Sequence, residues 1–264
     1  EYLSDKKIKE LRSKATEEIL AKKTYPIAFK VNRKNTSLFN FKGYEGTYID
    51  SKVTNGKRLF YDRTKPFTKE VNYYNNFVST KEIAIPKAYI LEQGWHKVID
   101  RLKDNKIEFL HFKKDTIITV ETQHINTFET RKMAYEGHYL HYNTSVKKTT
   151  KNILFRKGDV FIPTKQKGVR YIIETLEAEA TDSFFNWNFF DTILQQKEGY
   201  SAYVFEDIAE QFLIDNPSIK KAFDNKLKEE ESFAKNARAQ LYWIYKQTPH
   251  YEKAHLKLPI FKVY

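Results

Sequence analysis

The spacing of apolar residues changes twice along this chain of 264 residues, and that change limits the folds open to it. Residues 27–85 contain short alternating runs between turn residues, which is typical of strands. Residues 86–180 mix strand-like and helix-like runs. Residues 181–264 repeat apolar side chains every three to four positions, as helices do. We therefore predict a mixed α/β fold of the α+β kind, with a β-rich first part, a mixed sheet and a helical C-terminal part.

The first part opens with a predicted amphipathic helix from Glu1 to about Lys23. Its apolar side chains share one face, and these are Ile8, Leu11, Ala15 and Ile19. Ser4 is placed to cap the helix, and the residue before Pro26 avoids helical angles, so the helix should end there. Strand-like runs follow. Asn55-Gly56 predicts a hairpin turn, and Pro66 is expected to end the strand that comes after it.

The middle part begins with a strand at 87–91, a helix near 95–104 and a strand at 107–112. Strand, helix and strand over so few residues predict a right-handed βαβ unit with parallel strands. A longer strand-like run covers 116–125, and a helix is predicted over 169–176.

The last part contains predicted helices on either side of Asn216-Pro217, where proline suits the first turn of the second helix. The tail at 255–264 alternates like an edge strand. The expected segments are 1–85, 86–180 and 181–264, assembled into one or two compact units.

Charge and composition narrow the function classes. The net charge is +12, but lysines are spread along the whole chain, so a nucleic-acid partner is not favoured over simple solubility. The absence of cysteine excludes thiolate nucleophiles, disulfides and cysteine-based zinc sites. No apolar run reaches the ~20 residues of a membrane span, so we do not expect a transmembrane protein. The chain begins at Glu1 without Met or an apolar leader, and we expect a piece of a longer protein.

A zinc peptidase of the carboxypeptidase type needs a histidine with a glutamate three residues later, because this spacing places two ligands on one side of the metal. None of the seven histidines has Glu or Asp at that position. The sequence therefore predicts no catalytic residues and no cofactor in this chain.

The densest group of possible metal ligands is Glu136, His138 and His141. The neighbourhood looks extended, and side chains three apart on a strand point to opposite faces. We therefore expect surface or packing histidines more than a metal site. His250 and His255 flank Glu252 at a spacing that suits neither a helix face nor a strand face, so a structural tail is favoured there.

Several runs between Pro86 and Glu206 resemble one known family. They are Pro86–Ile90, Gly94–Ile99, Tyr135–His138, Phe155–Asp159, Ile162–Thr164, Glu174–Glu177, Asp182–Asp191, Gln196–Tyr200 and Val204–Glu206. Together they resemble the region that follows the peptidase domain in large exported zinc carboxypeptidases of Gram-negative bacteria.

That resemblance implies an accessory, non-catalytic C-terminal region that supports or shapes the catalytic domain. Zinc would belong to the parent's missing catalytic domain, and the partner would be the parent's N-terminal peptidase domain. The location would be periplasmic, outer-membrane-associated or secreted, where other envelope proteins are further possible partners. The family's zinc ligands and catalytic residues match no position in this chain.

The run from Asp182 to Asp191 is the candidate interaction surface, through Asp182, Trp187, Asn188 and Asp191. The alternative is that its aromatic side chains are simply core, as aromatic residues on helices usually are. Two other functions stay open. A protein- or glycan-interaction module would show a large exposed aromatic patch. A nucleic-acid binder would carry lysines and arginines on one face with stacking aromatic rings between them.

Overall fold

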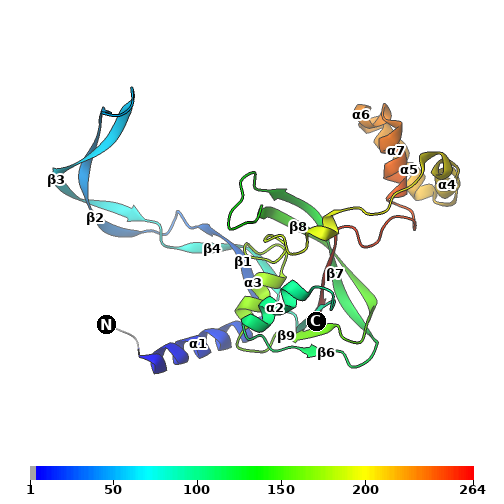
Figure 1. Cartoon of the computed structure of the whole chain (residues 1–264), viewed down its shortest axis with the longest axis horizontal. Helices are drawn as coiled ribbons and strands as arrows, with labels where there is room; N and C mark the ends of the chain where they lie inside the picture. The colour runs from blue at the N-terminus through cyan, green and yellow to red at the C-terminus, as the bar shows by residue number, and fades with distance from the viewer. Residues whose placement is uncertain (1–3) are drawn as a thin grey trace. The chain divides into compact units, whose positions relative to one another are not determined.

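The structure is a computed structural model that describes residues 4–264 (Figure 1). Its contacts divide the chain into two units. One unit is Lys22–Ala84, and the other is the chain up to Ala21 together with Ile85–Tyr264. The predicted mixed α/β fold is confirmed, since both units contain sheets and the second also contains helices.

The helices are α1 Asp5–Leu20, α2 His96–Asp104, α3 Val169–Leu176, η1 Asp191–Leu194, α4 Ala202–Asp215, α5 Pro217–Glu229, α6 Glu231–Ala234 and α7 Ala237–Tyr245. The strands are β1 Thr24–Val31, β2 Ser37–Asp50, β3 Lys57–Tyr73, β4 Phe77–Ala84, β5 Ala88–Leu91, β6 Leu110–His111, β7 Thr116–Thr130, β8 His141–Phe155, β9 Val160–Pro163 and β10 Lys257–Val263.

A six-stranded sheet organises the larger unit, in the order β6-β9-β5-β10-β7-β8. The predicted strand–helix–strand unit is β5, α2 and β6. β9 lies between its two strands and is antiparallel to both. β5 and β6 therefore run parallel, as predicted, but share no hydrogen bonds.

The C-terminal strand β10 corrects one prediction. It lies in the middle of the sheet, between β5 and β7, and its residues from Leu258 to Phe261 are buried. The expectation of an edge strand is wrong. Proline normally marks an edge because it cannot donate a ladder hydrogen bond. Pro259 is tolerated here because the β10–β7 register is interrupted between Lys257 and Phe261.

Each face of this sheet carries a hydrophobic cluster. The larger one packs side chains of the sheet against α2, α3 and the segment after α3, and its members include Tyr89, Leu102, Ile162, Ile172, Phe185 and Phe190. The smaller one contains Ile90, Val120, Phe155 and Phe261. The alternation along β5 supplies both, because neighbouring residues on a strand point to opposite faces.

The helices α4 to α7 build a separate hydrophobic cluster around Phe205, Phe223 and Tyr245. Pro217 occupies the first turn of α5, as predicted. The N-terminal helix α1 is also confirmed, and the Ser4 hydroxyl accepts from the Lys7 N–H at 3.3 Å. Glu1 to Leu3, which the prediction included, lie outside the described residues. None of the side chains of α1 is buried.

The smaller unit is an antiparallel ribbon, residues 24–84, in which β1 pairs with β4 and β2 pairs with β3. Figure 1 shows β2 and β3 as one long hairpin, and the predicted Asn55-Gly56 turn lies at its tip. Pro66 does not end β3, contrary to the prediction, and pairs with Tyr44. In a two-stranded ribbon every strand has a free edge, so a missing N–H is tolerated.

One face of this ribbon is apolar. Residues paired across a ladder share a face, and the β2–β3 register therefore places five side chains together, Phe39, Phe41, Phe67, Val71 and Tyr73, which we name the aromatic face. The Phe39 and Tyr73 ring centroids are 5.8 Å apart, and those of Phe41 and Phe67 are 6.1 Å apart. Gly43 is required beneath the second pair, since a Cβ there would lie 2.9 Å from both rings.

No other residue of the ribbon covers the aromatic face. No residue from 28 to 82 is buried, and Phe39 and Tyr73 are 51% and 54% exposed. A two-stranded hairpin is marginally stable alone in water, and a soluble protein seldom exposes a contiguous apolar surface of this length. The ribbon therefore exposes more apolar surface than a two-stranded unit usually does.

Candidate functional site

His141, one of the three candidate metal ligands, is the centre of a buried hydrogen-bond network. It begins β8, and its ring bridges the end of β7 and the start of η1. The Thr130 hydroxyl lies 2.9 Å from His141 Nδ1, and Asp191 Oδ1 lies 3.0 Å from His141 Nε2. The Asn188 amide donates to the Tyr139 carbonyl at 2.9 Å and lies 3.2 Å from His141 Nε2. The structure thus brings the candidate metal ligand His141 together with the candidate interaction residues Asn188 and Asp191.

The other candidate ligands point elsewhere. The His138 ring stacks on Phe189 at 6.2 Å and meets Trp187 edge-on at 5.6 Å. Glu136 lies in an exposed turn with a φ of 50°. Within residues 4–264, no group of three His, Cys, Asp or Glu side chains is arranged to hold a metal ion. The chain turns at Glu136 and Gly137, before His138, and the rings of His138 and His141 face different neighbours.

A hydroxyl, an imidazole and a carboxylate in line resemble the relay of a hydrolase. His141 is only 6% exposed, however, and both of its ring nitrogens have partners. The network can therefore hold the segment after α3 against the β7–β8 hairpin, but it offers no free nitrogen to a ligand.

The run from Asp182 to Asp191 contains both buried and exposed side chains. Phe184, Phe185 and Phe190 are buried, as the packing alternative predicts. Of the predicted interaction residues, Asp182 and Asp191 are exposed, while Trp187 and Asn188 are half-buried. The Trp187 indole N–H donates to Asp182 Oδ1 at 3.4 Å. The Asn188 amide donates to the Asp191 carboxylate at 3.4 and 3.2 Å, so the four residues form two hydrogen-bonded pairs.

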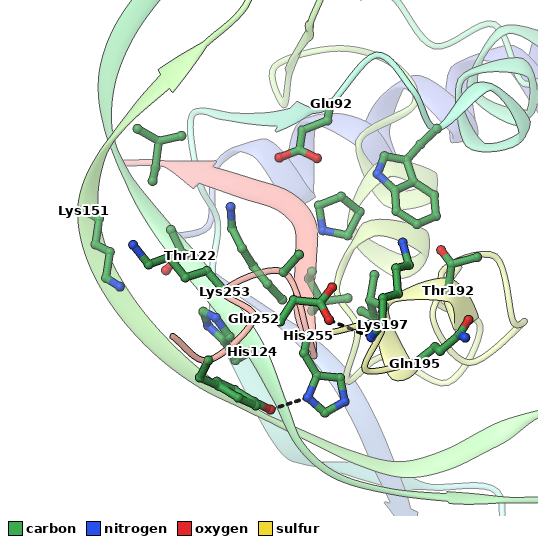
Figure 2. Close-up of a pocket in the computed structure, with 18 residues that line it drawn as sticks. Glu92, Thr122, His124, Lys151, Thr192, Gln195, Lys197, Glu252, Lys253 and His255 are labelled. Atoms are coloured by element: carbon green, nitrogen blue, oxygen red, sulfur yellow. Dashed lines mark hydrogen bonds between the residues drawn. The ribbon is translucent and has the colours of Figure 1, made fainter. Parts of the chain in front are cut away.

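One cavity of the larger unit was not predicted. It has a volume of about 680 Å³ and is built by five separate segments of the larger unit (Figure 2). The segments are the turn after β5, the middle of β7, the middle of β8, the chain around η1, and the residues leading into β10. The lining includes Glu92, Trp95, Thr122, His124, Lys151, Thr192, Gln195, Lys197, Glu252, Lys253, His255 and Lys257. We name it the basic pocket.

Four lysines line this pocket, Lys151, Lys197, Lys253 and Lys257. None of them forms a salt bridge with another residue in the part of the chain that the structure describes. The positive charge of two of these lysines affects the pKa of His124. Burial lowers the pKa of His124, and the charges of Lys151 and Lys257 lower it further. The histidine therefore favours its neutral form, and the ammonium groups supply the positive charge.

The two carboxylates of the pocket, Glu92 and Glu252, have pKa values that are shifted in opposite directions. Burial raises the pKa of Glu92, although Lys257 and a hydrogen bond from Trp95 oppose this. Glu252 accepts backbone N–H bonds from Lys197 at 2.7 Å and Glu198 at 3.2 Å, and these lower its pKa. Glu252 thus fixes the chain after η1, whereas Glu92 is available to a ligand.

The tail that was expected to be structural contributes to this pocket. The Tyr251 hydroxyl is hydrogen-bonded to His255 Nδ1, and His255 Nε2 lies 3.3 Å from the Leu194 carbonyl oxygen. No local pattern could have predicted the pocket, because its walls come from segments up to 167 positions apart, Glu92 and Pro259 being the extremes.

A second unpredicted group lies inside the sheet. Lys262 is 1% exposed, and its ammonium contacts Glu121 at 2.9 Å and Glu177 at 3.1 Å. Glu177 also accepts from the Tyr89 hydroxyl at 2.7 Å. A lysine inside the apolar run of β10 was a signal for such a buried pair, since a buried charge requires a partner. The group is structural, because its members are occupied with one another.

Comparison of the chain with known proteins gives no match, neither to a family model nor to a curated protein nor to a solved structure. Among the helices of residues 4–264, none is both long and apolar enough to cross a membrane.

Proposed function

We propose that this chain is a non-catalytic accessory region of a zinc-dependent carboxypeptidase-like peptidase, and that the ribbon docks on the parent's peptidase domain. The resemblance of nine runs between Pro86 and Glu206 supports the parentage. The zinc and the peptide cleavage belong, in this proposal, to the peptidase domain. Export to the periplasm, the outer membrane or the medium is part of the same proposal.

The observation that carries the docking role is the uncovered aromatic face. Five apolar side chains lie side by side on β2 and β3, in a unit that has no buried residue from 28 to 82. Burying apolar surface stabilises a complex by roughly 25 cal/mol per Å² before the costs of association are subtracted. A partner that covers this face gains that energy, and the ribbon gains the second layer that a two-stranded sheet lacks.

Charge favours an acidic partner over a second copy. Residues 22–84 contain 13 Lys or Arg against 5 Asp or Glu, a net charge of +8 out of +12 for the whole chain. Two ribbons meeting face to face would repel each other, whereas a surface of opposite charge is steered toward the ribbon. We therefore expect an acidic rim around an apolar patch on the peptidase domain.

Zinc analysis and carboxypeptidase assays test the parentage. We expect this chain alone to be inert and free of stoichiometric zinc, and a longer natural protein that includes it to bind zinc and remove C-terminal residues from peptides. Zinc binding with peptide cleavage by the isolated chain would overturn the proposal. So would a parent whose other domains belong to a different class of protein.

A triple substitution on the aromatic face tests the docking. Phe39→Thr, Phe41→Thr and Phe67→Thr keep strand-forming residues but remove the apolar surface. We expect affinity for the separately produced peptidase domain to fall by about tenfold or more, because apolar anchors dominate interface energy. The measurement is calorimetric titration of one polypeptide with the other.

Asn40→Ser with Thr68→Ser is the matched control, since both residues lie on the opposite face of the same strands. This control should bind within about twofold of the unaltered chain. Equal binding by the triple variant would show that the aromatic face is not the docking surface.

The second candidate is an interaction module for another envelope protein or a glycan, and the same uncovered face favours it. The two proposals separate in the titration, because an independent module has no measurable affinity for the peptidase domain. Nucleic acid is less well supported. The aromatic face carries a single basic residue, Lys69, so cations are not interleaved with its rings.

A further inference from the structure

We propose that the basic pocket binds an acidic sugar, a short oligosaccharide that carries carboxylate groups. This inference goes beyond the proposed function, because it concerns a different surface and holds whether or not the parent is a peptidase. It rests on three properties of the lining, which are an excess of unpaired cations, free hydrogen-bonding groups and an aromatic wall.

The size of the pocket sets the size of the ligand. Small-molecule sites occupy about 300–1,000 Å³, and this cavity is about 680 Å³. Its walls come from strands and from segments anchored to them, since Thr122 and His124 lie on β7 and Lys151 on β8. The cavity therefore has room for two or three sugar residues, and the strands β7 and β8 form one side of it.

The excess of cations favours an anionic ligand. Four lysines face two glutamates, and one of these, Glu252, is already committed to two backbone N–H groups. Figure 2 shows Lys151 on the β8 side of the cavity and Lys197 on the opposite side, near Thr192, so positive charge lies on two sides of the space. Charges that flank a cavity act on a ligand through less water than charges on an open surface do.

Neutral groups in the lining are free to bind hydroxyl groups. Neither the Thr192 hydroxyl nor the Gln195 amide makes a hydrogen bond within residues 4–264. Glu92 adds a carboxyl group whose raised pKa means that it takes up a proton more readily than an ordinary glutamate, which lowers its repulsion of a neighbouring anion. Sugar hydroxyls are donors and acceptors at once, which is what this mixed set of groups requires.

Trp95 provides an apolar wall. Its ring meets Phe190 edge-on at a centroid distance of 4.9 Å and is half-buried. An indole fixed in this way offers ring surface to the apolar face of a sugar, while its N–H bonds Glu92. A phosphate ion or an acidic peptide would satisfy the lysines, but neither combines a row of hydroxyl groups for Glu92 and Gln195 with an apolar ring face for Trp95.

Titration of the full chain with a galacturonate trisaccharide tests the proposal, with a neutral trisaccharide of glucose and tri-glutamate as comparison ligands. We expect the galacturonate to bind, and its affinity to fall as salt rises from about 50 to 300 mM. The neutral sugar should not bind, and tri-glutamate should bind at least about tenfold more weakly. Chemical shifts of the Trp95 indole N–H report whether the ligand occupies the pocket.

Lys197→Gln with Lys253→Gln should weaken galacturonate binding by about tenfold. The control, Lys113→Gln with Lys114→Gln, removes the same charge from exposed positions outside the pocket and should leave binding within about twofold. Equal loss in both variants would mean unspecific attraction to a basic protein and would overturn the site. Equal binding of tri-glutamate would overturn the sugar assignment, and so would no binding of galacturonate to the unaltered chain.

Discussion

Replacing Lys262 by Met is expected to lower the free energy of unfolding by about 3–5 kcal/mol, because it leaves buried carboxylates without their cation. Lys262 is 1% exposed and Glu177 is equally buried. The methionine fills most of the space of the lysine stem, so the loss measures the missing charge more than a cavity. Urea denaturation followed by circular dichroism gives the value.

Two controls isolate the charge. Lys262→Met with Glu177→Gln removes both members of the pair and should recover part of the loss, since a buried ion pair is weakly stabilising as a whole. Lys147→Met removes an exposed lysine from β8 and should change stability by less than about 0.5 kcal/mol. A Lys262→Met variant as stable as the original chain would show that the carboxylates find other partners.

The same group predicts a loss of stability in alkali. Burial lowers the pKa of Lys262, but Glu177 and Glu121 outweigh it, so the pKa lies above the ordinary value. Burial and the charge of Glu177 raise the pKa of Tyr89 well above its ordinary value. A raised folded pKa gives stability that is complete below the unfolded pKa, about 10 for both groups, and disappears as pH rises through the folded value. The Lys262→Met variant should lose the lysine part of this pH dependence.

Acid affects Glu121 in the opposite sense. Burial raises its pKa, but the hydrogen bond and charge of Lys262 outweigh this and bring the pKa below its ordinary value. Stability from Glu121 is therefore complete above about pH 4.3, the unfolded value, and is lost as pH falls through the folded value. Lys262→Met removes that dependence as well.

The sequence predicted elements well where one face of an element is covered by the chain itself. In α3, Val169, Ile172, Ile173 and Leu176 repeat at helical spacing, and all are buried against the sheet. The periodicity is informative there because the pattern and its cover belong to the same molecule. The position of β10 failed because strand order depends on pairings between segments far apart in the chain.

The ribbon shows a different limit. Phe39 and Phe41 stand at alternate positions, which predicts a strand, and both lie on β2. Alternation specifies which side chains require a cover, but it does not specify what covers them. The expected β-rich segment is a single layer, and no residue of the ribbon itself forms a second layer. The basic pocket was out of reach for a related reason, since its lysines are dispersed in sequence and only the fold gathers them.

Replacing Phe190 by Ala is expected to cost about 3–5 kcal/mol of stability, the usual range for a phenylalanine removed from a core. Phe190 is fully buried in the larger cluster and supports the Trp95 ring. Trp187→Ala, three positions earlier and half-buried, should cost clearly less. Thermal and urea unfolding of the two variants decide between core and interaction surface for the Asp182–Asp191 run.

The Phe190→Ala variant also tests whether the core positions the Trp95 wall of the basic pocket. Without the Phe190 ring, the Trp95 indole loses the edge contact that fixes its orientation, so a ligand that packs on Trp95 must order it at the cost of side-chain entropy. A folded Phe190→Ala chain should therefore bind the galacturonate trisaccharide more weakly, while Trp187→Ala binds it normally. Equal stability losses in the two variants would contradict the core role of Phe190. Unchanged ligand binding by Phe190→Ala would show that Trp95 is positioned by other neighbours.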